Sequence, residues 1–290
     1  MMIRTLTSLA ILFALASAGR AQSDESSADT ADRPALKRPF ELPQAELDND
    51  AVSELTRAIE ANASEGLYVK RSREFARAGQ WSKAAADLRS AAEVGDSAMR
   101  RMQAGICLLL AKDRMSYQPL VEDMLERFKE SGSYYRTERT VKMCVLPTDP
   151  IVMRETAFEM IDRAVRASGS SPWAQYFPST QAMVRYRYGK HSEALESIAS
   201  SDRLNERIGP SQDVTAINRF LEALCRAKLG DRDKAQAAYD HGETILCEVF
   251  ADPELIREHG FWTDFLIAEL LRREADSVLA KAGAEKPAKQ

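Results

Sequence analysis

Residues 68–96 read YVKRSREFARAGQWSKAAADLRSAAEVGD and contain two helical patterns on either side of Gly79. Glycine permits a tight reversal of the chain at this point. Five and twelve residues after it, Ala84 and Ala91 are small enough to let two antiparallel helices approach closely. Four residues before it, Phe75 fills the space that remains. The stretch therefore predicts a helical hairpin.

The same pattern occurs twice more along the chain. Gly189 and Gly230 stand between helical segments as Gly79 does, with Ala194 and Ala235 five residues after them. The three glycines are separated by 110 and 41 residues. These spacings predict hairpins in an irregular array, with longer or degenerate units between the recognisable ones.

The hairpin at residues 68–96 resembles the 34-residue tetratricopeptide (TPR) unit, which cannot bury its apolar face alone and stacks into arrays. That resemblance implies an all-α fold, a right-handed α-α superhelix built as a TPR-like solenoid of helix hairpins. Five later segments look like the helical repeat region found in many planctomycete proteins, often behind a serine/threonine kinase domain. They read YQPLVEDMLERF (117–128), ERTVKMCVLPTDP (138–150), YRYGKHSEALESI (186–198), FLEALCRAKLGDRDKAQAAYDHG (220–242) and FWTDFLIAELLRREADSVL (261–279).

Kinase activity does not carry over from those longer relatives. The sequence has no Gly-rich phosphate loop and no H-R-D or D-F-G segment. The resemblance therefore implies a helical module that binds a partner.

The apolar pattern predicts further helices outside the three hairpins. One begins near Ala51, and two lie within 98–130, with Asp113 in the turn and Pro119 in the first turn of the second helix. Others cover about 135–145, 152–167 and 261–280, the last as a helix that caps the array. Charged runs such as Glu138-Arg139 are expected on solvated helix faces.

The N-terminus predicts export. Residues 1–21 combine a basic residue, a short apolar run and small-residue sites for cleavage after Ala18 or Ala21, as in a signal peptide. The apolar run is shorter than a membrane span, which disfavours the alternative of an uncleaved N-terminal anchor, and no stable membrane insertion is expected after cleavage. Residues 22–50, with eight acidic and three basic side chains, predict a disordered acidic linker. Residues 51–281 then form the helical repeat domain, and 282–290 a polar tail. The expected location is periplasmic or secreted.

Charge and cysteine content narrow the function further. The net charge of −4 provides no basic field for nucleic acid, so no nucleic-acid partner is expected. Cys107 and Cys144 lie 37 residues apart, about one repeat, so neighbouring helices could bring them together. Buried free thiols are the simpler interpretation, and a Cys107–Cys144 disulfide stays open.

No catalytic constellation is evident. His191, His241 and His259 are the only histidines, and none has a second ligand at metal-binding spacing. We therefore predict no catalytic residue, no cofactor and no metal.

The candidate binding surface is the concave groove, which the first helix of each TPR hairpin lines and which commonly receives a peptide. Offsets from the turn glycines place seven side chains there: Arg73, Arg77, Met183, Tyr186, Arg187, Phe220 and Lys228. Cations mixed with Tyr, Phe and Met would suit an acidic and apolar peptide. The competing interpretation is that Met183 and Phe220 are core residues and that the cations only confer solubility.

The function hypothesis is therefore an exported, non-catalytic TPR-like scaffold that binds a protein or peptide partner. The alternatives are an enzyme or enzyme accessory subunit with an unrecognised groove site, or a self-association module. A cleft with converging polar side chains of shifted pKa would favour the enzyme, and an open concave face would favour the scaffold.

Overall fold

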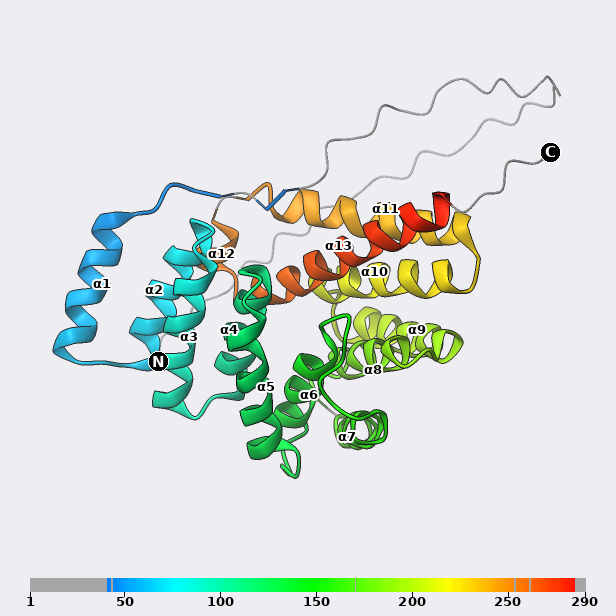
Figure 1. The fold of residues 1–290 in the computed structure, drawn as a ribbon, viewed down its shortest axis with the longest axis horizontal. Coiled ribbons are helices and arrows are strands. Elements are labelled where there is room, and N and C mark those ends of the chain that lie inside the picture. Colours follow the sequence, from blue (N-terminus) through cyan, green and yellow to red (C-terminus); the bar gives the residue numbers. More distant parts are fainter. Residues whose placement is uncertain (1–40, 43, 170, 253, 261, 285–290) are drawn as a thin grey trace, which may run out of the picture. The chain divides into compact units, whose positions relative to one another are not determined.

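The computed structural model describes residues 41–284 except 43, 170, 253 and 261. Within these residues the chain is all α-helical, as predicted, and contains no strand (Figure 1). The helices of this part are α1 (Asn49–Ala61), α2 (Glu65–Arg77), α3 (Trp81–Gly95), α4 (Ala98–Leu110), α5 (Arg114–Phe128), α6 (Tyr134–Val145), α7 (Arg154–Ala167), α8 (Tyr176–Arg187), α9 (His191–Ile208), α10 (Gln212–Lys228), α11 (Arg232–Val249), α12 (Leu255–Glu258) and α13 (Trp262–Ala284).

Four helix pairs in the described part of the chain share one kind of turn. The pairs α2/α3, α8/α9 and α10/α11 turn on Gly79, Gly189 and Gly230, whose φ angles are +67°, +78° and +82°. The residue after each glycine donates its backbone N–H to the carbonyl five residues earlier, as in a Schellman motif. The three predicted turns are therefore confirmed.

The fourth pair, α4/α5, uses a lysine where the others use glycine. Lys112 has a φ of +58°, and the N–H of Asp113 bonds to the carbonyl of Leu108 at 2.9 Å. Asp113 is not the left-handed residue but the N-cap of α5, since its carboxylate accepts from the N–H of Ser116. Helix α5 thus starts early enough to place Pro119 inside it, not in its first turn as predicted.

Small side chains let the paired helices approach each other. Ala84, Ala194 and Ala235 are fully buried at equivalent positions of α3, α9 and α11. The equivalent residue of α5 is Tyr117, which is also fully buried. Its ring fits because Gly105 of α4 has no side chain: a Cβ there would lie 3.3 Å from Tyr117 Cε2. In this pair the small residue therefore lies on the first helix, α4, and the large one on the second helix, α5.

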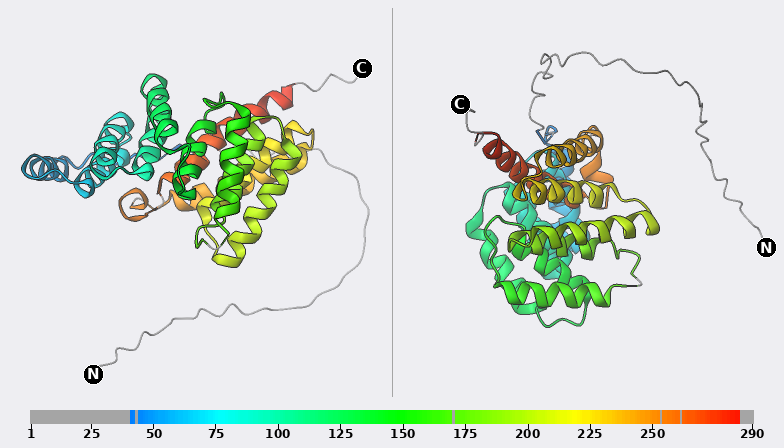
Figure 2. Two further views of the ribbon diagram at one scale, coloured as in Figure 1. Left: turned by 90° about the horizontal axis from the view of Figure 1, so that it is seen from below. Right: turned by 90° about the vertical axis from the view of Figure 1, so that its right-hand side faces the viewer.

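The last two helices return to earlier parts of the array. Helix α12 packs against α2, and α13 packs against α4, α10 and α11 (Figure 1). The further views in Figure 2 show α13, coloured red, running beside α10 in yellow. Trp262, Leu266 and Leu271 of α13 are at most 1% exposed. A terminal capping helix is expected to cover only the last hairpin, α10/α11. Helix α13 covers that hairpin and also packs against α4.

The described helices reach a few residues beyond both ends of the predicted repeat domain. Helix α1 starts at Asn49, two residues before Ala51, because the Asp48 carboxylate accepts from the N–H of Ala51 and caps the helix. The N–H of Ala45 bonds to the carbonyl of Arg77, so the end of the predicted linker is ordered against α2. Helix α13 extends to residue 284. The predicted signal peptide 1–21, residues 22–40 of the predicted linker and residues 285–290 of the predicted tail lie outside the described residues.

Candidate functional site

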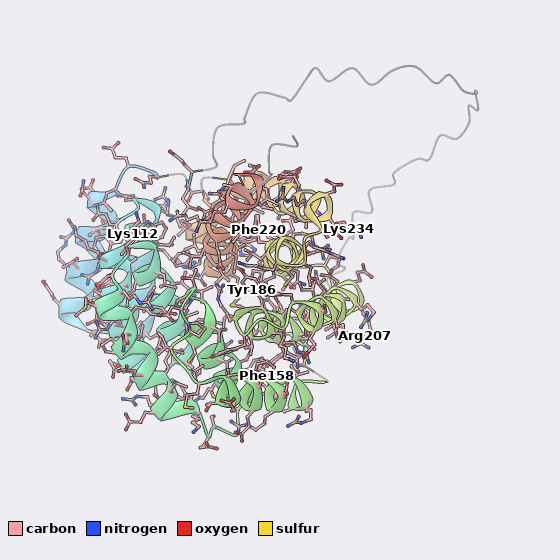
Figure 3. All side chains as sticks on the ribbon, turned by 45° about the vertical axis from the view of Figure 1, so that its right-hand side comes forward. Lys112, Phe158, Tyr186, Arg207, Phe220 and Lys234 are labelled. Atoms are coloured by element: carbon pink, nitrogen blue, oxygen red, sulfur yellow. The ribbon has the colours of Figure 1, made fainter. Side chains whose placement is uncertain are left out.

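Three of the seven predicted groove residues belong to the core, among them Tyr186, which is 6% exposed. Met183 of α8 and Phe220 of α10 are 1% and 0% exposed. Figure 3 shows Phe220 between helices, whereas Arg207 and Lys234 lie at the outer side. The Phe220 ring packs against Tyr239 of α11, with 5.7 Å between ring centroids. This corrects the prediction for Met183 and Phe220, because their positions on α8 and α10 face neighbouring helices and are closed to a partner.

Tyr186 and Arg187, at the end of α8, bind α13 instead of facing an empty groove. Arg187 donates to both carboxylate oxygens of Glu274 and to the carbonyls of Val145 and Leu146. The Tyr186 hydroxyl donates to Glu274 at 3.0 Å, and burial followed by the charge of Glu274 raises the pKa of this phenol. Lys228 lines the same surface hollow as Tyr186 and Arg187.

Arg73 and Arg77 of α2 contact the segment around α12. Arg73 donates to the backbone carbonyl of Arg257, and burial lowers its pKa. Arg77 pairs with Glu74 at 2.9 Å and with Glu254 at 3.5 Å. Glu74 in turn accepts from the Arg257 guanidinium at 2.7 Å. The predicted cations at this end of the array therefore hold the chain's own C-terminal segment.

Four predicted groove residues, Arg73, Arg77, Tyr186 and Arg187, thus contact residues 254–274. Glu254 and Glu274 supply the carboxylates that an acidic partner was expected to bring. This part of the predicted groove is consequently occupied from within the molecule.

A separate pocket of about 160 Å³ is lined mainly by residues of α4, α6 and α8, and we call it the α4–α6–α8 pocket. Each of these is the first helix of its pair. Its walls are largely aromatic: the rings of Tyr135 and Phe177 are 5.8 Å apart, and those of Trp173 and Tyr176 are 6.3 Å apart, centroid to centroid. The lining residues are Met99, Met102, Tyr135, Glu138, Arg139, Lys142, Trp173, Tyr176, Phe177 and Asp264.

The floor of this pocket is charged. Lys142 and Glu138, one turn apart on α6, form an ion pair at 2.8 Å, and Thr180 of α8 donates to the same carboxylate. Asp264, in the first turn of α13, lies 3.9 Å from the Lys142 ammonium. All three charged residues are only 4% exposed. Glu138 is therefore buried, which corrects the expectation that it lies on a solvated face.

The surroundings shift the pKa values of two of these groups. Burial raises the pKa of Asp264 to about 7, opposed by Lys142 and Arg139 and assisted by Asp213 and Glu138. Burial lowers the pKa of Lys142, but the Glu138 and Asp264 carboxylates outweigh it and leave a net rise. Lys142 stays protonated at neutral pH, whereas Asp264 exchanges its proton there.

None of the seven predicted groove residues lines the α4–α6–α8 pocket. One signal was present: Met102 lies ten residues before Lys112, the same offset as Phe220 before Gly230. This offset cannot be counted from the sequence, because the turn residue Lys112 is not a glycine and the sequence does not identify it as a turn. Helix α6 gives no such signal, because Leu146 to Met153 connect it to α7 without a residue of positive φ.

The cysteines and histidines form no site of their own. Cys107, Cys144 and Cys225 are buried free thiols, so Cys107 and Cys144 form no disulfide, and Cys247 is exposed. Burial raises the pKa of the Cys144 thiol to about 12, which keeps it unreactive. No group of three His, Cys, Asp or Glu residues that could hold a metal occurs in the described ranges.

No helix between residues 41 and 284, as far as the structure describes them, combines the length and apolarity needed to cross a bilayer.

Comparison with known proteins returns no match. No protein-family model, no curated protein and no solved structure matches this chain. The likeness to the TPR unit and to the planctomycete repeat region therefore rests on the sequence segments alone. The features that bear on function are the geometry of the pocket and of the helices that line it.

Proposed function

We propose that this chain is a non-catalytic helical-repeat scaffold that binds a protein or peptide partner, one side chain of which enters the α4–α6–α8 pocket. In the finer form of the proposal, the hairpins stack as a right-handed TPR-like superhelix, with α2, α4, α6, α8 and α10 as inner helices. The observation that carries it is the aromatic pocket on three of these first helices. First helices are where TPR-like arrays receive peptides.

The composition of the pocket favours binding over catalysis. Apolar and aromatic walls with a few fixed polar groups are typical of ligand sites. The Lys142 ammonium is held protonated beside Glu138, so it serves neither as a nucleophile nor as a base. None of the described lining residues is a serine, cysteine or histidine.

One observation favours the alternative of an enzyme or an enzyme accessory subunit. Asp264 faces the pocket with a pKa raised by burial to about 7, a value suited to proton transfer at neutral pH. A bound ligand that is recovered chemically unchanged after long incubation would support binding, and its conversion would support the enzyme. A third alternative, a self-association module, predicts an elution volume in sizing chromatography that depends on concentration.

We further propose that the chain is exported, since residues 1–21 have the order of a signal peptide. Mass spectrometry of the chain from its native host would then give a mature N-terminus at Gly19 or Gln22. An intact N-terminus in the cell-associated fraction would contradict the proposal.

The partner site is tested by selecting peptides from a random library on the full chain. The affinity of each selected peptide is then measured for two variants. Met99→Arg puts a positive charge on the half-buried rim of the pocket, and Met115→Arg puts the same charge on α5, where residue 115 is 87% exposed. Circular dichroism would first establish that both variants are folded.

The proposal expects binding to the wild type and to Met115→Arg, with a loss of at least about tenfold for Met99→Arg, because the charged side chain replaces the apolar contact that Met99 offers and is costly to desolvate. Equal affinities for the two variants, or no selectable peptide at all, would refute it.

A further inference from the structure

The interior around the α4–α6–α8 pocket contains more negative than positive charge. Three carboxylates are buried there: Glu138 of α6, Asp264 of α13 and Asp213 of α10, the last only 1% exposed. Lys142 is the one fully buried ammonium among the described residues that line the pocket. Arg139 adds a second positive charge, but it is only half-buried at the rim.

Glu138 and Asp213 have close hydrogen-bonding partners for their carboxylates, whereas Asp264 does not. Glu138 has Lys142 at 2.8 Å and the Thr180 hydroxyl, and Asp213 accepts from the Tyr176 hydroxyl at 2.6 Å. Asp264 has the Lys142 ammonium at 3.9 Å and the more distant Arg139, and no described side chain donates a hydrogen bond to its carboxylate. A buried carboxylate with so distant a partner is costly to keep ionised.

The walls suit a cation. Aromatic faces attract positive charge through the ring quadrupole. Two cations already use this attraction here: Lys142 Nζ lies 5.6 Å from the ring centre of Tyr176, and Arg139 Cζ lies 5.5 Å from that of Tyr135. The volume of about 160 Å³ exceeds by far the 10–15 Å³ or so that one water requires, so a side chain fits.

From this arrangement we infer that the pocket binds an alkylammonium group, which pairs its charge with the Asp264 carboxylate and packs its methylene groups against the aromatic walls. The inference rests on the proposed function, in which the group is a lysine side chain of the bound partner. A free primary amine has the same chemistry, and the experiment below separates the two sources.

Binding of this kind depends on pH. The groups that face Asp264 are Lys142, Glu138 and Arg139 from α6, Tyr176 from α8 and Asp213 from α10. Their combined effect with burial leaves the Asp264 pKa at about 7, so its carboxylate is mostly protonated at pH 6 and mostly ionised at pH 8. An alkylammonium ion stays charged across this range and needs the ionised carboxylate, so its affinity rises about tenfold from pH 6 to pH 8.

The test is calorimetric titration of the full chain with n-butylammonium and with n-butanol, which has the same number of heavy atoms and no charge. The inference expects n-butylammonium to bind more tightly than n-butanol and about tenfold more tightly at pH 8 than at pH 6. Asp264→Asn should abolish both differences. Asp149→Asn is the matched control, because this carboxylate is exposed in its ion pair with Arg114. Equal binding of the amine and the alcohol, or an unchanged pH dependence in Asp264→Asn, would overturn the inference.

A second variant, Trp173→Leu, tests the inference independently if the Asp264→Asn protein does not fold. Trp173 is 41% exposed at the rim, so Trp173→Leu removes an aromatic wall and leaves the charged floor in place. It should weaken n-butylammonium severalfold and n-butanol less. An equal effect on both would count against the cation-binding role.

Peptides separate this inference from the proposed function. Selected peptides are compared before and after acetylation of their lysines, which removes the charge. Loss of binding on acetylation supports the inference with a peptide as the source. Binding that depends on Met99 but survives acetylation keeps the proposed function and overturns the inference. If n-butylammonium binds but no selected peptide depends on Met99, the amine site stands and the proposed function falls.

Discussion

Arg187 of α8 and Glu274 of α13 form a buried, two-pronged ion pair, with 2.6 Å between Nη2 and Oε2. The arginine side chain is 3% exposed and that of the glutamate 13%. Arg187 also donates to two backbone carbonyls at the end of α6, so one side chain joins α6, α8 and α13. The C-terminal helix is thereby fixed to α6 and α8.

We expect Arg187→Leu to lower the free energy of unfolding by about 3–5 kcal/mol, because Glu274 would be left buried without its partner. Urea denaturation measures the effect. Arg207→Leu, an exposed arginine on α9, is the control and should change stability by less than about 0.5 kcal/mol. A loss below about 1 kcal/mol for Arg187→Leu would show that the pair does not hold α13 in place.

The left-handed turn residues give a pair of opposite predictions. Lys112→Gly should stabilise the protein by about 1 kcal/mol, since a side chain at φ +58° is strained. Gly189→Ala should destabilise the protein by a similar amount, about 1 kcal/mol, because an alanine at a φ of +78° is strained. No atom lies within 4 Å of the new Cβ, so this backbone strain is the only expected effect. Thermal unfolding of both variants measures this, and shifts of the same sign would contradict the common turn.

Two helical glycines should respond oppositely to alanine. Gly242→Ala would place a Cβ 2.8 Å from the fully buried ring of Phe220 and should cost about 1–3 kcal/mol. Gly66→Ala in α2 meets nothing within 4 Å and should gain about 0.5–1 kcal/mol from helix propensity. Urea midpoints compare the two, and a neutral Gly242→Ala would argue against the close contact of α10 with α11.

The Asp264 carboxyl should make stability fall as pH rises. Its pKa is raised from 3.8 to about 7 by burial first, so between these values the folded state holds a proton that the unfolded state has released. The free energy of unfolding should therefore decrease from pH 4 to pH 7, by on the order of 2–4 kcal/mol from this group. The quantity to measure is the wild-type value minus that of Asp264→Asn. A difference that stays constant with pH would refute the shift.

The sequence predicts the hairpins well because their signals are local. A glycine at the turn and an alanine five residues later are enough to identify α2/α3, α8/α9 and α10/α11. The α4/α5 hairpin escapes the same rule because Lys112 adopts the left-handed conformation and the small residue, Gly105, lies on the opposite helix.

The α4–α6–α8 pocket could not be predicted in this way, because it depends on packing between distant segments. Met99 and Asp264 are 165 positions apart and meet only because α13 returns to α4. Glu138 and Lys142 have the i,i+4 spacing of an ordinary surface ion pair, and nothing local distinguishes a buried pair from a solvated one.

The most direct test of the account is a methyl NMR spectrum of the full chain with labelled methionines, recorded during titration with a selected peptide. Met99 and Met102 line the α4–α6–α8 pocket, whereas Met115 and Met153 are 87% and 74% exposed elsewhere. We expect the peptide to shift the methyl signals of Met99 and Met102 and to leave those of Met115 and Met153 in place. Unmoved pocket methionines in the peptide-bound protein would contradict the claim that the partner enters this pocket.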